Sequence, residues 1–242
     1  MREAERVQQA DGAVRVAMPG AFARLAPQLA ARFAATPAGA VAGSIVFAAF
    51  RPSGLLAQAI LAGEPADVYV SANVLWMRRL QRAGFVQHWA TLASNRLCIV
   101  AVPSAQVERL EDLARTGLRV VAPQAATDPC GRYIEQLWRR EGLLAAMRAK
   151  QAAGELVRSV GSGDLPGFLF DGRAQVGMFY LSEARQLDAG QVQTLELPAG
   201  QDLHERIRFV VAALSERGAP FVRFLLSPTG RDTLIAAGFV GR

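Results

Sequence analysis

The sequence predicts an α/β fold, and three observations carry that prediction. Short apolar runs rich in β-branched residues alternate along the chain with segments whose apolar residues recur at helical spacing. Polar residues, Gly or Pro stand where an apolar run ends and a helical segment begins. The chain has 242 residues, enough for one large domain or for two lobes of about a hundred residues, and either arrangement can bury a core. Because strands that alternate with helices form parallel pairs, we expect each lobe to contain a mostly parallel sheet flanked by helices.

The composition excludes several classes of protein. The net charge is +6, but the sequence contains no run of five or six like charges, so no nucleic-acid partner is expected. It also contains no apolar stretch of about twenty residues that would span a membrane. The two cysteines, Cys98 and Cys130, are too few for a disulfide framework and lack metal-binding spacing, and Cys98 lies in an apolar run typical of the core. We therefore expect neither a cofactor nor a bound metal ion.

The first elements follow in order from residue 14. Residues 14–18 are mostly apolar, which predicts a strand, and Gly20 leads into a helix over 22–35 with apolar residues on one face. Residues 41–49 are a near-continuous apolar run, which predicts a strand covered on both faces. This part of the chain thus predicts a strand, a turn, a helix and a second strand.

The segment from Ser53 to Trp76 is the clearest unit of the sequence. Ser53 and Gly54 give an N-cap signal for a helix that ends at Gly63. Residues 68–70 are a short β-branched and aromatic run, which predicts a buried strand before the next helix. A helix that begins with Ser-Gly presents free N–H groups, a hydroxyl and the positive end of its dipole, and these suit an anion.

The rest of the chain repeats this alternation. Apolar runs predict further strands over residues 95–103, 119–122, 174–180, 192–197 and 206–212. Two of them, 95–103 and 206–212, stand where the family resemblance carried by residues 63–77 implies hinge strands that cross between the lobes. This division places residues 12–101 and 207–242 in lobe I, which is discontinuous, and residues 102–206 in lobe II.

Four junctions between a strand end and a helix start carry the candidate binding residues, two in each expected lobe. In doubly wound sheets the ligand lies beyond the carboxyl ends of the strands, so two such sheets facing each other would enclose it. Backbone N–H groups and hydroxyls at helix starts suit a small anion. The candidate ligand-binding residues are Gly20, Ala21, Ser53, Gly54, Asp128, Cys130 and Tyr180.

Residues 63–77 also carry a resemblance to a known family. The strings Gly-Glu-Pro-Ala-Asp-Val at 63–68, Ser-Ala at 71–72 and Trp-Met at 76–77 resemble the periplasmic molybdate-binding proteins of ABC importers, which have the type II solute-binding fold. The resemblance covers roughly residues 14–240. It implies a two-lobed, monomeric periplasmic protein that captures molybdate or tungstate for the membrane subunits of an ABC transporter.

The resemblance assigns roles to two candidates and fails at a third. The family's first junction usually carries a Ser that touches the oxyanion, and Ala21 stands there in this chain. Tyr180 stands where bacterial members have a Tyr that donates its hydroxyl to the oxyanion; the alternative is a strand-end Tyr packed on the core. Asp128 lies in a string similar to archaeal-type binders, whose Asp approaches the oxyanion; the alternative is a helix N-cap. Phe179 stands where that archaeal type has a Glu ligand.

Two functions from different classes are left open. The first is a non-enzymatic solute-binding protein for a tetrahedral oxyanion. The second is a cytoplasmic ligand-sensing or regulatory domain of the same fold that binds another small anion, since residues 1–11 lack the apolar core of a secretory signal. An enzyme is not expected, because the only histidines, His88 and His204, lie in no nucleophile motif and are expected at the surface or at an interface.

Overall fold

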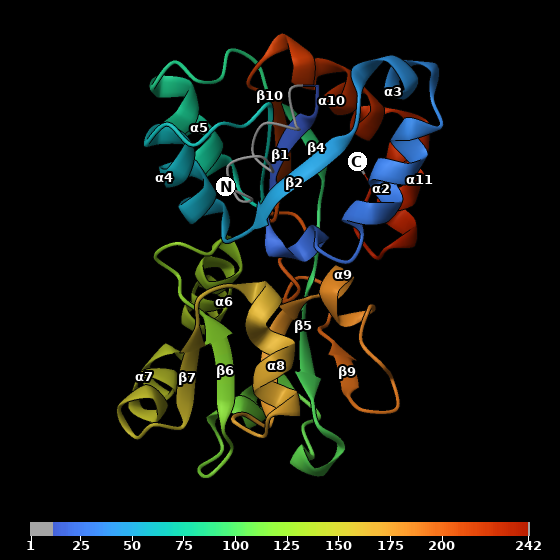
Figure 1. Cartoon of the computed structure of the whole chain (residues 1–242). Helices are drawn as coiled ribbons and strands as arrows, with labels where there is room; N and C mark the ends of the chain where they lie inside the picture. Colours follow the sequence, from blue (N-terminus) through green and yellow to red (C-terminus); the bar gives the residue numbers. More distant parts are fainter. Residues whose placement is uncertain (1–11, 242) are drawn as a thin grey trace, which may run out of the picture.

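The computed structural model describes residues 12–241 and contains two lobes, one above the other in Figure 1. Each lobe is built on its own five-stranded sheet with helices around it. The predicted two-lobed α/β fold is therefore confirmed. The sheets are mixed and not mostly parallel as predicted, because each contains two parallel and two antiparallel pairings. The prediction about a secretory signal concerns residues 1–11, which lie outside the described residues. Within residues 12–241, no helix has the length and apolar character needed to cross a bilayer.

The sheet of lobe I combines parallel and antiparallel strands in the order β2-β1-β3-β10-β4. Its strands are β1 (Val14–Met18), β2 (Ile45–Phe50), β3 (Val68–Ser71), β4 (Ala90–Ala93) and β10 (Phe209–Ala213). β1 pairs in parallel with β2 and β3, whereas β10 runs antiparallel to β3 and β4. A strand from the C-terminal part of the chain thus lies inside the sheet that the N-terminal part builds.

The sheet of lobe II repeats this plan in the order β7-β6-β8-β5-β9. Its strands are β5 (Leu97–Ala101), β6 (Val120–Pro123), β7 (Leu156–Ser159), β8 (Val176–Tyr180) and β9 (Gln193–Glu196). β6 is parallel to β7 and β8, and β5 is antiparallel to β8 and β9. β5 follows a crossing from lobe I, so it enters its sheet from the cleft side and points away from lobe I, opposite to β6 (Figure 1).

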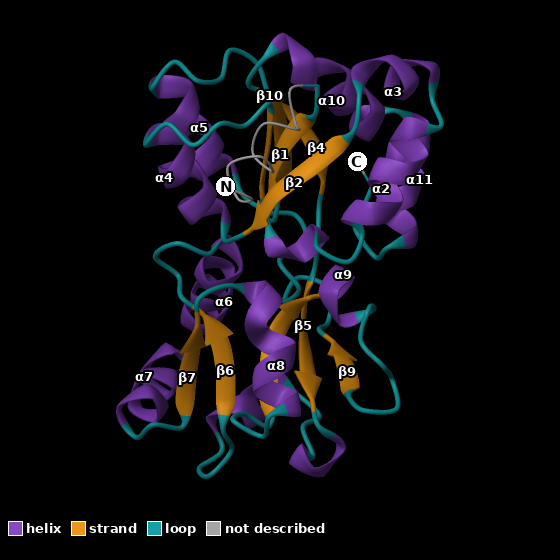
Figure 2. Cartoon of the chain, in the orientation of Figure 1, coloured by secondary structure: helices purple, strands orange, loops and turns teal. Residues whose placement is uncertain are grey.

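Helices flank both sheets, as the purple segments of Figure 2 show. In lobe I, α4 and α5 pack on one face of the sheet, and α2 and α10 pack on the other. The α-helices are α2 (Ala26–Ala34), α3 (Pro37–Ala42), α4 (Ser53–Leu61), α5 (Val74–Arg82), α6 (Pro129–Arg140), α7 (Leu144–Ala152), α8 (Leu165–Phe170), α9 (Leu181–Ala184), α10 (Ala219–Leu226) and α11 (Pro228–Ala236). Single 3-10 turns are η1 (Gly20–Phe22), η2 (Pro103–Ala105), η3 (Leu110–Ala114), η4 (Ser162–Asp164) and η5 (Glu216–Gly218).

The two crossings between the lobes are bonded to each other. Ser94 lies at the end of the first chain segment of lobe I. Its hydroxyl donates to the carbonyl oxygen of Ile207 at 2.7 Å. The strand Leu97–Ala101 lies in the sheet of lobe II, so the first crossing comes before residue 97 and not after residue 101 as the predicted division has it. The remaining lobe boundaries stay a prediction.

The predicted strand over residues 41–49 is wrong in its first part. Residues up to 42 belong to α3, because Thr36 caps that helix by accepting the Gly39 N–H at 3.0 Å. Gly43 then ends it with a φ of +84°. The strand that follows, β2, is an edge strand and partly exposed, with Val46 at 41% exposure, so it is not covered on both faces. An apolar run alone does not distinguish an edge strand from a central one.

An aromatic cluster spans the boundary between the lobes. Phe209 of β10 packs edge-on against Phe22 at 5.6 Å between ring centroids and against Tyr180 of lobe II at 5.3 Å. All three rings are buried. Cys98 is buried in β5, as its apolar run predicts. The cluster fixes the carboxyl end of β8 against lobe I, and this is where a predicted binding residue stands.

Candidate functional site

The two lobes meet at positions where no side chain intervenes. The N–H of Gly54, at the start of α4, donates to the carbonyl oxygen of Thr127 in lobe II at 3.0 Å. Gly20, at the start of η1, faces Gly163 of η4, so closely that a Cβ on Gly20 would lie 3.3 Å from the Gly163 Cα. The structure therefore brings the candidate junctions of lobe I directly against lobe II.

Ser53 is the first residue of α4 and is fully buried. The predicted N-cap role is wrong by one position, since Pro52 is the N-cap and no side chain caps the helix. Instead the Ser53 Oγ accepts the N–H of Ala72 at 3.0 Å, and the Ser53 carbonyl accepts the hydroxyl of Tyr69 at 2.8 Å. These bonds tie the start of α4 to the end of β3, and the Ser53 Oγ serves in them as an acceptor.

Asp128 is the N-cap of α6, as the alternative interpretation of its string predicts. Its Oδ1 accepts the N–H of Cys130 at 2.7 Å, and its Oδ2 accepts the N–H of Ser162 at 2.9 Å. Burial raises the pKa of Asp128 to about 6, although these N–H donors favour its ionised form. The carboxylate therefore occupies donors that an incoming anion could otherwise use.

Cys130 contributes no free donor to the cleft. Its N–H is taken by Asp128, and its thiol is fully buried. Burial raises the pKa of that thiol well above its ordinary value, and the charge of Asp128 adds to the effect. Cys130 is thus a neutral core residue beneath the cleft. The N–H of Gly54 is not free either, because it donates to the carbonyl oxygen of Thr127.

Tyr180 stands at the carboxyl end of β8 and is 1% exposed. Its ring packs on Phe209, as the core interpretation predicts, but its hydroxyl is buried and finds no hydrogen-bond partner among residues 12–241. Burial raises the pKa of this hydroxyl well above its ordinary value, so it is a neutral donor at physiological pH. Buried hydroxyls without a partner are rare, and each one needs an explanation.

A pocket of about 220 Å³ lies between the lobes beside these residues. Two predicted residues, Gly20 and Ala21, line it from lobe I, while Ser53, Gly54, Asp128, Cys130 and Tyr180 do not. Lobe II contributes Gly163 and Glu183 to the opposite wall. The structure thus gathers all four junctions at one boundary, but only the first of them opens into the pocket.

Three charged residues that line this pocket, Arg24, Asp164 and Glu183, were not predicted as binding residues from the sequence. Arg24 reaches from lobe I to lobe II, where its guanidinium donates to the carbonyl oxygen of Gln186 at 2.6 Å. An Arg four residues after a strand–turn junction gives no signal by itself, because its direction depends on how the lobes meet. Glu183 follows Tyr180 by one helical turn, and that spacing could have indicated it.

Glu183 begins a hydrogen-bond chain that runs from the pocket to α6. Its Oε1 accepts the hydroxyl of Ser162 at 2.9 Å, and the N–H of Ser162 donates to Asp128. The other carboxyl oxygen, Oε2, is buried and has no partner in the described part of the chain. Burial, reinforced by the charge of Asp128, raises the pKa of Glu183 to about 8. Lobe II therefore presents a carboxyl group that is mostly protonated at neutral pH.

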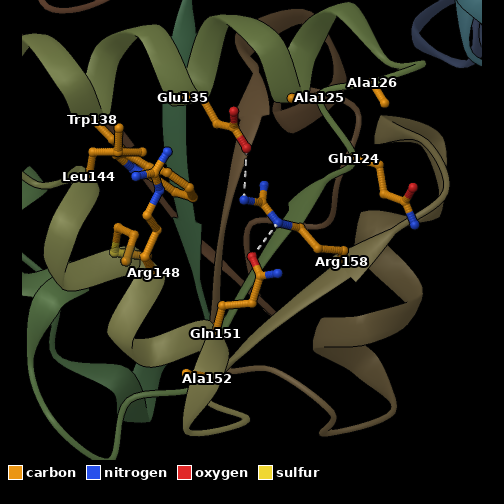
Figure 3. A pocket seen from close by; sticks show the side chains of 11 residues that line it. Gln124, Ala125, Ala126, Glu135, Trp138, Leu144, Arg148, Gln151, Ala152 and Arg158 are labelled. Atoms are coloured by element: carbon orange, nitrogen blue, oxygen red, sulfur yellow. Dashed lines mark hydrogen bonds and ion pairs between the residues drawn. The ribbon is translucent and has the colours of Figure 1, made fainter.

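A groove of about 740 Å³ lies on lobe II away from this boundary, between α6, α7 and β7 (Figure 3). Three of its polar side chains are bonded to one another. Arg158 donates to Glu135 at 2.9 Å and to Gln151 at 3.1 Å, and it lies over the ring of Trp138 (Figure 3). None of the predicted binding residues lines this groove.

The histidines take no part in the interlobe site. His88 is exposed, and His204 is half-buried with its Nδ1 2.8 Å from a carboxylate oxygen of Asp202. Residues 12–241 contain no group of three or more His, Cys, Asp or Glu side chains placed to hold a metal ion.

Two α/β lobes with a small pocket between them define a cleft-type binding protein. The chain belongs to the bacterial extracellular solute-binding proteins, whose family model matches residues 14–240.

Individual relatives agree with this family. The molybdate-binding protein ModA of Mycobacterium tuberculosis is 28% identical over 200 residues, which are 79% of this chain and 72% of that protein. The periplasmic molybdate-binding protein of Azotobacter vinelandii superposes with a TM-score of 0.79 at 22% identity, covering 95% of this chain and 99% of the other. The sulfate-binding protein SubI of M. tuberculosis gives 0.71 at 17% identity, covering 94% and 85%. These two solved structures share the fold of this chain.

Proposed function

We propose that this chain captures a small tetrahedral oxyanion, molybdate or tungstate first, between its lobes. The observation that carries the proposal is the hydroxyl of Tyr180, a buried donor without a partner at the end of β8. A buried polar group left unpaired costs about 1–3 kcal/mol, and an oxyanion oxygen within reach would remove that cost. A bound ligand would supply the hydrogen-bond acceptor that this hydroxyl lacks in the free protein.

Other donors at the boundary support the same ligand class. The hydroxyl of Ser53 has a proton to donate, and the first N–H groups of η1, from Gly20 and Ala21, have no partner within their turn. Arg24 adds a positive charge to the pocket wall. The 220 Å³ of the pocket exceeds the volume of a tetrahedral oxyanion. Neutral donors with one cation hold an anion while still allowing its release.

The relatives support molybdate as the first ligand to test. Several proteins with matching sequences are named molybdate-binding proteins, and structural neighbours include binders of sulfate and phosphate. Membership in the bacterial extracellular solute-binding family supports a role outside the cytoplasm. We propose that the chain acts there as a monomer, catalyses no reaction and delivers its ligand to the membrane subunits of an ABC importer.

Titration calorimetry with molybdate, tungstate, sulfate and phosphate tests the proposal. We expect saturable binding of one molybdate or tungstate per chain and weaker binding of the other two. Ligand at about a hundred times its Kd should raise the free energy of unfolding by about 2.7 kcal/mol, visible as a higher melting temperature. Chloride at the same ionic strength is the control. Absence of heat and of a thermal shift with all four oxyanions would overturn the assignment.

A further inference from the structure

Glu183 has an arrangement that a purely structural carboxylate would not need. One oxygen, Oε1, is held by the hydroxyl of Ser162, while Oε2 is buried and unpaired, although the side chain lines the pocket between the lobes. The carboxyl is therefore fixed in direction and incomplete in its hydrogen bonds. Tyr180 lies one turn earlier on the same segment, and its hydroxyl oxygen is likewise buried without a hydrogen-bond partner.

The surroundings of Glu183 disfavour its charge. Burial and the neighbouring carboxylate of Asp128 both raise its pKa, whereas hydrogen bonding from the Ser162 hydroxyl and from the backbone of Tyr180 lowers it. Arg24 faces the same pocket from lobe I, and Asp164 faces it from η4. Other titratable groups nearby are Cys98, Cys130 and Tyr180. Burial raises the pKa of each of them well above its ordinary value, so all three are neutral.

We propose, resting on the proposed function, that Glu183 is a further ligand-binding residue that meets the oxyanion as a protonated carboxylic acid and donates its O–H to it. A fully deprotonated oxyanion such as molybdate then binds together with one proton. Where free Glu183 is ionised, that proton comes from the solvent and ends on Oε2; no other bond forms or breaks. Ionised Glu183 beside a dianion would instead place two negative charges against each other with no proton between them.

This arrangement makes the choice among oxyanions depend on pH. Molybdate carries no proton that it could donate to an ionised carboxylate. Its affinity should therefore fall at a pH where Glu183 is ionised. Hydrogen phosphate carries a hydroxyl that can donate a hydrogen bond to the ionised carboxylate, so its binding requires no proton uptake. Glu183 would therefore determine specificity between fully deprotonated and protonated oxyanions.

Calorimetry with molybdate from about pH 6.5 to 9.5, in two buffers of different ionisation enthalpy, tests the proposal. We expect constant affinity at the acid end and a fall of about tenfold per pH unit above the pKa of Glu183. Over the same range, uptake should approach one proton per anion. Glu183→Gln cannot ionise and keeps a neutral N–H donor, so molybdate binding by this variant should show neither the alkaline fall in affinity nor the proton uptake. Glu111→Gln, an exposed Glu on η3, is the matched control and should keep them.

Each outcome decides between the proposals. Molybdate binding without proton uptake by the wild-type chain overturns the role of Glu183 and leaves the proposed function intact. A Glu183→Gln protein that keeps the alkaline fall and the uptake overturns it as well. If none of the four oxyanions binds, the proposed function is wrong and this inference fails with it. The uptake measured on the wild-type chain needs no variant, so the test stands even if Glu183→Gln folds poorly.

Discussion

The N–H of Gly54 donates to the carbonyl oxygen of Thr127 at 3.0 Å, so the start of α4 in lobe I is hydrogen-bonded directly to lobe II. A Cβ at position 54 would lie 2.5 Å from that carbonyl oxygen and 2.7 Å from the Trp76 ring. Only a residue without a side chain allows this approach. The contact makes Gly54 a residue that holds the lobes together, whereas the sequence suggested it as an anion donor.

Gly54→Ala should therefore weaken ligand capture by opening the boundary. The new methyl cannot be accommodated without moving Thr127 or Trp76, so we expect molybdate affinity to fall at least about tenfold, or 1.4 kcal/mol. Small-angle scattering should show a larger radius of gyration. Gly167→Ala, in α8, is the matched control, since its Cβ would meet only the end of Arg173 at 3.8 Å. An unchanged affinity and radius in Gly54→Ala would contradict this role.

Tyr180→Phe should change stability and affinity in opposite directions. The substitution removes a buried hydroxyl that has no partner, so the ligand-free protein should be equally stable or more stable, by up to about 1 kcal/mol. Molybdate affinity should fall about tenfold, because the ligand loses a donor. Thermal melts without ligand and calorimetry with it measure the two effects.

Tyr69→Phe is the control for that pair of measurements. The Tyr69 hydroxyl donates to the Ser53 carbonyl oxygen at 2.8 Å, so its loss should lower stability by about 1 kcal/mol. A Tyr180→Phe protein that is as destabilised as Tyr69→Phe, with unchanged affinity, would show that Tyr180 is only a core residue.

The positions of the four junctions could be predicted from the sequence, because local signals set them. Asp128 before Pro129 is a complete N-cap signal, and the cap is where the string places it. The partners of these junctions could not be predicted, because they come from the other lobe. Nothing local indicates that the Gly54 N–H meets Thr127. For the same reason the position of Arg24 in the site could not be predicted, since its guanidinium reaches across the boundary to the other lobe.

Strand order was the other part that local pattern could not supply. The apolar runs of β2 and β5 look alike in sequence, yet β2 is a half-exposed edge strand and β5 is central and buried. Burial on a strand depends on its neighbours in the sheet, and these come from residues far away along the chain. The pairing of β10 between β3 and β4 is an example.

Ser53→Ala should lower both stability and affinity. Removing Oγ leaves the N–H of Ala72 buried without its acceptor, which should cost about 1–3 kcal/mol in the free energy of unfolding. If the hydroxyl proton also serves the ligand, molybdate affinity should fall by a further tenfold or so. Ser53→Thr keeps the hydroxyl and tests whether the site tolerates an added methyl. Denaturant unfolding and calorimetry separate the two losses, and unchanged affinity would remove Ser53 from the site.

Glu183→Gln should make the ligand-free protein more stable at alkaline pH and leave it unchanged in acid. The folded-state pKa of about 8 lies above the ordinary value of 4.5, so the stability that protonation gives is fully present below about pH 4.5 and is lost as the pH rises through about 8. Gln cannot ionise and still accepts from Ser162, so the variant escapes that loss. Because the side chain is only half-buried, we expect a gain of about 1–3 kcal/mol at pH 9. Urea unfolding at pH 5 and pH 9 measures it, with Glu111→Gln as the exposed control. An equal difference from wild type at both pH values would show that burial does not disfavour the charge of Glu183.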